Sequence, residues 1–380
     1  MQKKIFDVVI FSLISLVAFY GSALAFSNSD LEGTWYGYLS EANPAAGVYW
    51  IYGTFTIDSS GKITDGRYTG PDGTSLAVTG GQMTVDSEGV VGGTIIAEGG
   101  LTGTFPTGKM DRNKSIVAFV GFDNNESLDI GVAIKAGGSF SASDLEGTWY
   151  VYVSEANPEA GVYWIYGTFT VDSSGKITGG SYSGPDGTTV AVTGGELTVD
   201  SEGIIAGTYT AAGGLAGTFP TGKMDRNKSI VAFVGFDNNE SLDIGKAIKA
   251  GGSFSARDLE GTWYGYISEA NPAAGVYWLY GTFTLDTSGN ITGGSYTGPD
   301  GTSLKVTGGE MTVDSEGVVS GTIIAEGGLT GTFPTGKMDR NKSIVAFVGF
   351  DNNESLDIGV AIKAGQVSRG LLPVLMLLFD

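Results

Sequence analysis

The 380-residue chain contains neither cysteine nor histidine. Without cysteine, no disulfide can hold a folded unit together, so each unit must be stabilised by its own hydrophobic core. Without histidine, Ser-His-Asp and Cys-His nucleophile pairs, histidine zinc sites and imidazole acid–base catalysis are excluded. These absences argue against an enzyme, and we expect no cofactor.

Basic residues are scarce, with 21 Lys and Arg against 41 Asp and Glu and a formal net charge of −20. Such a surface repels phosphate backbones, which argues against a nucleic-acid partner. The simplest interpretation of an acidic protein is solubility, and the alternatives are divalent cations or cationic partners.

No apolar run is long enough to span a membrane as a helix. Lys3 and Lys4, an apolar stretch at 8–20 and the small residues Ala23-Leu24-Ala25 predict a secretory signal peptide over 1–25, with an uncleaved anchor as the alternative. The mature chain is then secreted, extracellular or at the cell surface, or periplasmic. The apolar tail at 366–380 contains Pro373 and is too short to span a bilayer. We expect it to cover the last domain or to lie on a membrane or a partner.

The sequence repeats three times. "DLEGTWY" begins at Asp30, Asp144 and Asp258, so the period is 144 − 30 = 258 − 144 = 114 residues. A period of this length fits a complete small domain, which predicts domains at 30–136, 144–250 and 258–364. "GGSFSAS" at 137–143 and "GGSFSAR" at 251–257 read as short flexible linkers between them.

Each repeat shows strand patterns and no helical period. Leu128, Ile130, Val132 and Ile134 alternate with polar or small residues, as on a half-buried strand. Short turns such as "GPDG" at 70–73 force neighbouring strands to be antiparallel. About eight strands are expected in the first repeat, one around Trp35 and the others at 50–57, 63–68, 76–85, 90–97, 101–105, 116–122 and 128–134.

Closure into a barrel removes the two exposed edges of an eight-strand meander. The predicted fold class is therefore all-β, with three tandem antiparallel up-and-down β-barrels of about eight strands each. A single 24-stranded outer-membrane barrel is disfavoured because turns come too often. Six propeller blades are disfavoured because the visible subrepeat is a hairpin.

"GTWY" at 33–36, 147–150 and 261–264 resembles the first strand of the calycins, the lipocalin and avidin-like barrels with a Gly-x-Trp motif. The resemblance implies an eight-stranded barrel with Trp35, Trp149 and Trp263 plugging one end, and it places Lys135, Lys249 and Lys363 near those rings. The sequence lacks a lipocalin-type flanking helix, a disulfide and later tryptophans like those that wall the avidin ligand site. The resemblance therefore implies little about a ligand. The repeats are also similar to uncharacterised secreted tandem-repeat proteins of Gram-negative bacteria.

The aromatic patch at 33–53 is the first candidate binding site. About half of its side chains point out of the barrel, where Trp and Tyr stack on sugars or peptides, and the alternative is a core plug. The candidate ligand-binding residues are Trp35, Tyr36, Tyr38, Tyr49, Trp50, Tyr52, Trp149, Trp164, Trp263 and Trp278.

Two turns of each repeat are further candidates. "DNNESLD" places oxygen ligands at alternate positions, as a calcium loop begins, although its Gly and closing Glu are missing and Asp and Asn are ordinary turn residues. These candidate Ca²⁺ ligands are Asp123, Asn125, Asp129, Asp237, Asn239, Asp243, Asp351, Asn353 and Asp357. "KMDRNK" is the most basic spot, where Lys109, Arg112 and Lys114 are suited to a contact between domains or molecules, including self-association; a solvated turn is the alternative.

The segment 103–131 recurs unchanged at 217–245 and 331–359, whereas earlier positions differ, such as Gly37 against Val151 and Ile95 against Tyr209. Recent duplication and a shared surface both account for the identity.

The favoured hypothesis for function is a secreted, non-catalytic adhesion or interaction module that binds an extracellular glycan or protein by multivalency. The alternatives are a small apolar ligand inside each barrel, as the resemblance implies, and a carboxylate-dependent glycosidase.

Overall fold

The computed structural model describes residues 25–365. The predicted apolar tail and all of the predicted signal peptide except Ala25 lie outside the described residues. Within them, no helix has the length and apolar character needed to cross a membrane.

Each repeat contributes eight strands. The first comprises β1 (Gly33–Asn43), β2 (Gly47–Ile57), β3 (Ile63–Thr69), β4 (Ser75–Val85), β5 (Val90–Ala97), β6 (Thr102–Met110), β7 (Ile116–Asp123) and β8 (Leu128–Lys135). The second comprises β9 (Gly147–Asn157), β10 (Gly161–Val171), β11 (Ile177–Ser183), β12 (Thr189–Val199), β13 (Ile204–Ala211), β14 (Ala216–Met224), β15 (Ile230–Asp237) and β16 (Leu242–Lys249). The third comprises β17 (Gly261–Asn271), β18 (Gly275–Leu285), β19 (Ile291–Thr297), β20 (Ser303–Val313), β21 (Val318–Ala325), β22 (Thr330–Met338), β23 (Ile344–Asp351) and β24 (Leu356–Lys363).

Six short 3₁₀ helices accompany the strands in residues 25–365. One precedes each barrel, and one lies between its fifth and sixth strands. They are η1 (Asn28–Asp30), η2 (Glu98–Gly100), η3 (Ala142–Asp144), η4 (Ala212–Gly214), η5 (Ala256–Asp258) and η6 (Glu326–Gly328).

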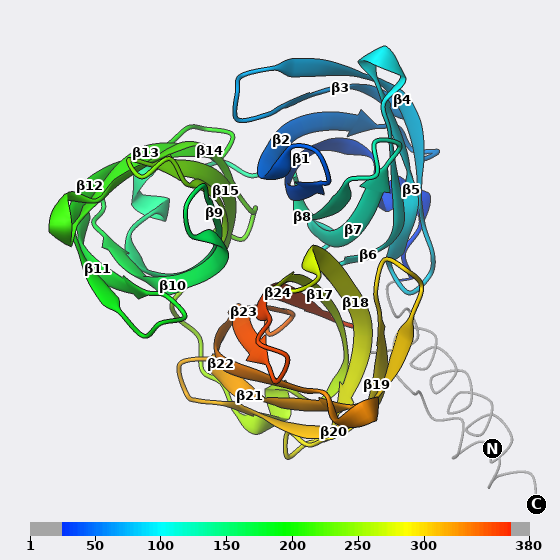
Figure 1. Ribbon diagram of the computed structural model, residues 1–380. Coiled ribbons are helices and arrows are strands. Elements are labelled where there is room, and N and C mark those ends of the chain that lie inside the picture. Colours follow the sequence, from blue (N-terminus) through cyan, green and yellow to red (C-terminus); the bar gives the residue numbers. More distant parts are fainter. Residues whose placement is uncertain (1–24, 366–380) are drawn as a thin grey trace, which may run out of the picture.

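Each set of eight strands closes into an antiparallel up-and-down barrel (Figure 1). In barrel 1 the last strand, β8, returns to β1 in a register that runs from Trp35↔Lys135 to Ala42↔Leu128. The predicted fold class and the calycin-like eight-stranded barrels are confirmed. A single 24-stranded barrel and a six-bladed propeller are both wrong for this chain.

The sixth strand is longer than predicted because Pro106 does not end it. The pairing of β6 with β7 shifts between Thr104 and Thr107, so a bulge accommodates the proline, which has no N–H to donate to the ladder. The strand then continues to Met110.

Tryptophan closes one end of each barrel, as the calycin resemblance implies. The Trp35 ring is buried, and its Nε1 donates a hydrogen bond to the carbonyl oxygen of Leu31 at 2.7 Å. Lys135 Nζ lies 5.5 Å from the centroid of this ring and donates to the Asp30 carbonyl oxygen. Lys249 and Lys363 lie over Trp149 and Trp263 in the same way, so the expected Lys–Trp pairs are confirmed.

The three barrels are arranged around a common centre (Figure 1). The first two strands of each barrel pack against the last two strands of the next, and barrel 3 packs in the same way against barrel 1. The indole Nε1 of Trp50 donates to the Gly235 carbonyl oxygen, that of Trp164 to Gly349, and that of Trp278 to Gly121, at 2.8 to 2.9 Å. The third of these contacts joins the last barrel to the first and closes a ring.

The segments 137–143 and 251–257 are not flexible linkers, and that prediction is wrong. Phe140 is buried against the barrel that follows it, with Lys223 Nζ 4.7 Å from its ring centroid. Phe254 occupies the equivalent place in barrel 3. An apolar anchor within each Gly- and Ser-rich segment gives that segment something to bury, which composition alone does not reveal.

Candidate functional site

The aromatic patch of each repeat is divided between the two faces of its sheet. Trp35 and Tyr49 lie on the face toward the barrel interior, on the same side as Leu39 and Glu41, because side chains alternate along a strand. The outward-facing aromatic residues are Tyr36, Tyr38, Trp50 and Tyr52, which pack into the core shared by the three barrels.

The outward aromatic side chains contact neighbouring barrels and are not an exposed stacking surface. Tyr38 is 1% exposed, and Tyr36 donates its hydroxyl to Glu202 of barrel 2 at 3.2 Å. Trp164 and Trp278 are buried in the same core as Trp50, whereas Trp149 and Trp263 plug their barrels as Trp35 does. The six tryptophans therefore divide into three barrel plugs and three contacts between barrels.

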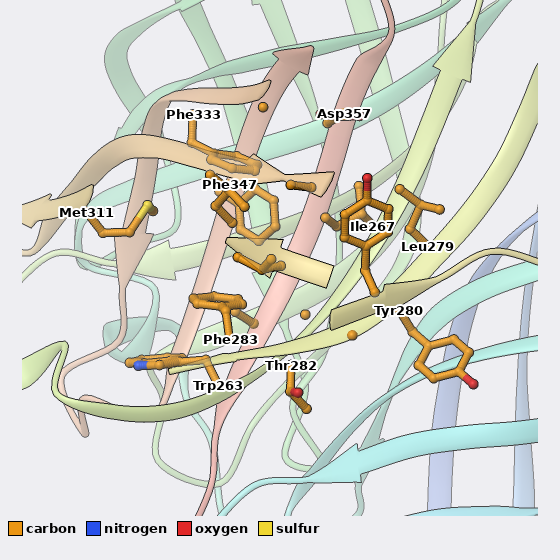
Figure 2. A pocket seen from close by; sticks show the side chains of 18 of the residues that line it. Trp263, Ile267, Leu279, Tyr280, Thr282, Phe283, Met311, Phe333, Phe347 and Asp357 are labelled. Atoms are coloured by element: carbon orange, nitrogen blue, oxygen red, sulfur yellow. The ribbon is translucent and has the colours of Figure 1, made fainter. Parts of the chain in front are cut away.

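The interiors of barrels 1 and 3 are hollow. Barrel 1 contains a cavity of about 130 Å³ and barrel 3 one of about 110 Å³. The lining of the first is mostly apolar and includes Leu39, Ile51, Phe55, Met83, Ile95 and Phe119. In barrel 3, Trp263 and Asp357 lie at opposite ends of the lining, and Tyr280 points away from it (Figure 2).

Barrel 2 is largely filled by its own side chains. Tyr209 stands where barrels 1 and 3 have Ile95 and Ile323, and its ring stacks on Phe219 at 5.4 Å and lies 5.7 Å from Phe169. Val151 adds volume where the other barrels have Gly37 and Gly265. Two remnants of about 50 and 20 Å³ remain.

Three acidic side chains gather at the end of the cavity opposite the tryptophan. Glu41 and Asp129 are cross-strand partners on β1 and β8, and both line the barrel 1 cavity together with Asp123. The Glu41 carboxylate accepts hydrogen bonds from the Tyr49 hydroxyl and from Ser127 Oγ, the latter at 2.8 Å. Burial, followed by hydrogen bonding to Glu41, raises the pKa of Tyr49.

Asp129 is the member of this group with an unpaired carboxylate oxygen. It is 5% exposed, and its Oδ1 has no hydrogen-bond partner in the part of the chain that the structure describes. Burial first, and then the charges of Glu41 and Asp123, raise the pKa of Asp129 well above its usual value. The same holds for Asp357 in barrel 3 and Asp243 in barrel 2. In barrels 1 and 3 the buried hydroxyls of Tyr68 and Tyr296 also have no partner among residues 25–365.

Of the residues predicted to bind Ca²⁺ in barrel 1, Asp123 and Asp129 line the same cavity, whereas Asn125 does not. Asp123 Oδ1 accepts the backbone N–H groups of Asn125 and Ser127 at 2.8 and 2.9 Å, as in an ordinary Asx turn. Asp129 lies in the barrel and Asn125 is exposed. The equivalents of Asp123, Asn125 and Asp129 in the other two repeats are Asp237, Asn239, Asp243, Asp351, Asn353 and Asp357. Within 25–365, no group of three His, Cys, Asp or Glu residues is placed to hold a metal ion.

The basic turn is engaged in contacts within the molecule. Lys109 is 1% exposed, donates to the Glu88 carbonyl oxygen and lies 4.6 Å from the Tyr264 ring centroid of barrel 3. Arg112 donates to the Ala364 carbonyl oxygen at 2.7 Å, and Lys114 forms a 2.8 Å ion pair with Asp30.

Sequence reasoning missed the inward-facing acidic pair and the residues that fill barrel 2. The alternation that places Trp35 inside also places Glu41 inside, six positions later on the same strand, and that signal was available. The change from Ile95 to Tyr209 was visible as a difference between repeats, but only closure of the barrel shows that the side chain points inward.

Comparisons with known proteins find no matching family model and no similar curated protein. Among solved structures, transferrin binding protein B from Neisseria meningitidis aligns with 88% of this chain and 77% of its own, at 12% identity and a TM-score of 0.27. A DUF3598-family protein of unknown function from Nostoc punctiforme aligns with 59% of this chain and 99% of its own, at 11% identity and a TM-score of 0.24. Structural similarity at these TM-scores supports no conclusion about the function of this chain.

Proposed function

We propose that this is a secreted, non-catalytic binding protein in which barrels 1 and 3 each hold a small apolar ligand. The observation that carries the proposal is the pair of apolar cavities of about 130 and 110 Å³ beside a third barrel that is filled. Enclosed apolar cavities of roughly 150 Å³ bind single-ring hydrocarbons, so the natural scale of the ligand is one ring or a short branched chain.

The contrast between barrels supports binding over incomplete packing. Empty core volume destabilises a protein by roughly 24 cal/mol per Å³. The same strands and the same segment 103–131 accommodate a filled interior in barrel 2, because a Tyr209 ring fits over Gly217. That two barrels keep a cavity which the third barrel fills therefore supports a role for these cavities in ligand binding.

Adhesion by multivalency stays a prediction with less support. It drew on flexible linkers between independent domains, whereas the aromatic side chains that were candidates for an exposed surface are buried between the barrels. A glycosidase would require a carboxylate pair flanking a sugar-sized cleft, and a narrow apolar cavity does not favour it.

Calorimetric titration with ethylbenzene tests the proposal on the full chain, and we expect two molecules bound per chain. Gly37→Val with Ile95→Tyr copies the barrel 2 filling into barrel 1, and should reduce the stoichiometry to one. Adding Gly265→Val with Ile323→Tyr should abolish binding.

The reverse exchange is the matched control. Val151→Gly with Tyr209→Ile should empty barrel 2 and raise the stoichiometry to three. Native protein that binds no single-ring probe, ethylbenzene included, or filled variants that still bind two equivalents while melting at the native temperature, would refute cavity binding.

A further inference from the structure

We propose that the ligand of barrels 1 and 3 carries an ammonium head group, which binds the carboxylate of Asp129 or Asp357 while its apolar body lies toward the tryptophan plug. This inference rests on the proposed function and adds the chemical class of the ligand.

The first support is the unpartnered carboxylate oxygen. Buried polar atoms are nearly always hydrogen-bonded, because leaving one unpaired costs about 1 to 3 kcal/mol. Asp129 Oδ1 and Asp357 Oδ1 have no partner within the described residues, and both side chains line the cavities. Within the same residues, Asp243 Oδ1 in barrel 2 is unpartnered as well, but only barrels 1 and 3 have a cavity of about 110 to 130 Å³ in which a ligand could bring a donor to this oxygen.

The charges around this oxygen select the kind of donor. The charged groups that act on Asp129 are Glu41 and Asp123, both acidic, and the groups packed against Glu41 are the neutral Tyr49 and Ser127. In their ionised forms these three carboxyls attract a cation and repel an anion. Three N–H donors on one ammonium also suit a site that offers both Asp129 Oδ1 and the unpartnered Tyr68 hydroxyl as acceptors.

The second support is the side chain that occupies barrel 2. Tyr209 places an aromatic ring among Phe169, Tyr182 and Phe219, and it lines the same remnant cavity as Asp243. The protein's own filling is thus a single ring beside Asp243, whose Oδ1 still has no hydrogen-bond partner in the described residues. A ligand with one ring and a short polar head would reproduce this arrangement in barrels 1 and 3.

The long dimension of the cavity agrees with such a ligand. Trp263 and Asp357 lie at opposite ends of the lining in barrel 3, with Phe283 and Phe347 between them (Figure 2). The ring would contact the phenylalanines, and the ammonium group would reach the carboxylate.

The test compares four probes that share a phenyl ring and differ in the head: 2-phenylethylamine, 2-phenylethanol, 3-phenylpropanoate and ethylbenzene. Titration of the full chain should give the amine at least ten-fold tighter binding than ethylbenzene and the carboxylate the weakest binding. Ethylbenzene that binds as tightly as the amine would overturn the head-group inference and leave the proposed function intact. Failure of all four would overturn both.

Asp→Asn variants locate the effect. Asp129→Asn with Asp357→Asn removes the charge at nearly constant volume, and should remove the preference for the amine while ethylbenzene binding persists. Asp243→Asn is the matched control, since barrel 2 is filled, and should leave amine binding unchanged. If the double variant does not fold, Asp357→Asn alone should reduce the number of tight amine sites from two to one. An amine preference that survives in the Asn variants would overturn the assignment of this carboxylate.

Discussion

Lys246 on β16 shows how one residue distinguishes the middle barrel. It occupies the position that Val132 and Val360 hold in the other barrels, beside a small central cavity also lined by Ser154 and Ser268. Burial lowers the pKa of Lys246 to about 8. The charged form is therefore disfavoured in the folded protein. At any pH at which Lys246 is charged, it destabilises the ring of barrels.

Lys246→Val should stabilise the protein at pH 7 by about 2 kcal/mol, because the desolvation penalty disappears and an apolar side chain joins the shared core. The folded pKa is lower than the unfolded one, so the penalty is full below pH 8 and is relieved as pH rises toward 10.5. Thermal melts of both proteins at pH 7 and pH 10 should show a smaller difference at the higher pH. An equal difference at both would mean that packing alone is responsible.

A second prediction at this scale concerns Asp243. Its raised folded pKa means that the carboxyl contributes most to stability when protonated, below its unfolded pKa, and that this contribution is lost as pH rises through the folded value. Asp243→Asn should therefore raise the melting temperature at pH 7, by an amount equivalent to roughly 1 to 3 kcal/mol, and change it little at pH 3.5. Calorimetry at the two pH values checks this, and a loss of stability at pH 7 would contradict it.

At the scale of elements, the turn between β6 and β7 depends on one carboxylate. Asp111 Oδ1 accepts the N–H groups of Ser115 and Ile116 at 2.7 and 2.8 Å, and Oδ2 accepts that of Asn113 at 3.1 Å. This network fixes the turn whose neighbour, Arg112, contacts the last residues of barrel 3.

Asp111→Asn should destabilise the protein by about 1 to 3 kcal/mol, since one amide NH₂ group would then face a backbone N–H in a buried site. Chemical denaturation measures the loss. Glu126→Gln, at an exposed turn position, is the control and should stay within about 0.5 kcal/mol of the native protein. A variant at Asp111 as stable as this control would show that the turn does not depend on the carboxylate.

The elements were largely predictable because their signals are local. Alternating residues such as Leu128 to Ile134 and turns such as "GPDG" define strands without reference to the rest of the chain. The site was less predictable. Tyr36 and Tyr38 face opposite ways from Trp35, and whether the outward face meets solvent or another barrel depends on contacts 166 or more residues away. Strand alternation gives the direction of a side chain but not what it meets.

At the scale of the whole molecule, the contacts between barrels form one continuous apolar core. Side chains from all three barrels contribute to it, among them Tyr38, Tyr152 and Tyr266. Domains joined by a large apolar interface are expected to lose their structure together.

We therefore expect a single calorimetric unfolding transition for the full chain. Trp278→Phe removes the hydrogen bond to Gly121 that joins barrel 3 to barrel 1 and keeps an aromatic ring in place. It should lower the stability of the whole transition by about 1 to 2 kcal/mol without dividing it. Three resolved transitions in the native protein, or a selective loss in barrel 3, would contradict a shared core.

Ring closure also bears on how many repeats such a chain can usefully carry. Each barrel packs through one surface, formed by its first two strands, against a different surface, formed by the last two strands of its neighbour. Packing of this head-to-tail kind stops adding copies only when the last copy meets the first and a ring closes. Here the third barrel completes that rotation. A fourth copy would find both complementary surfaces occupied and would expose its own Trp and Tyr side chains to solvent. The geometry of the ring thus limits the number of repeats to three. Further duplication would bring a risk of aggregation rather than one more binding unit.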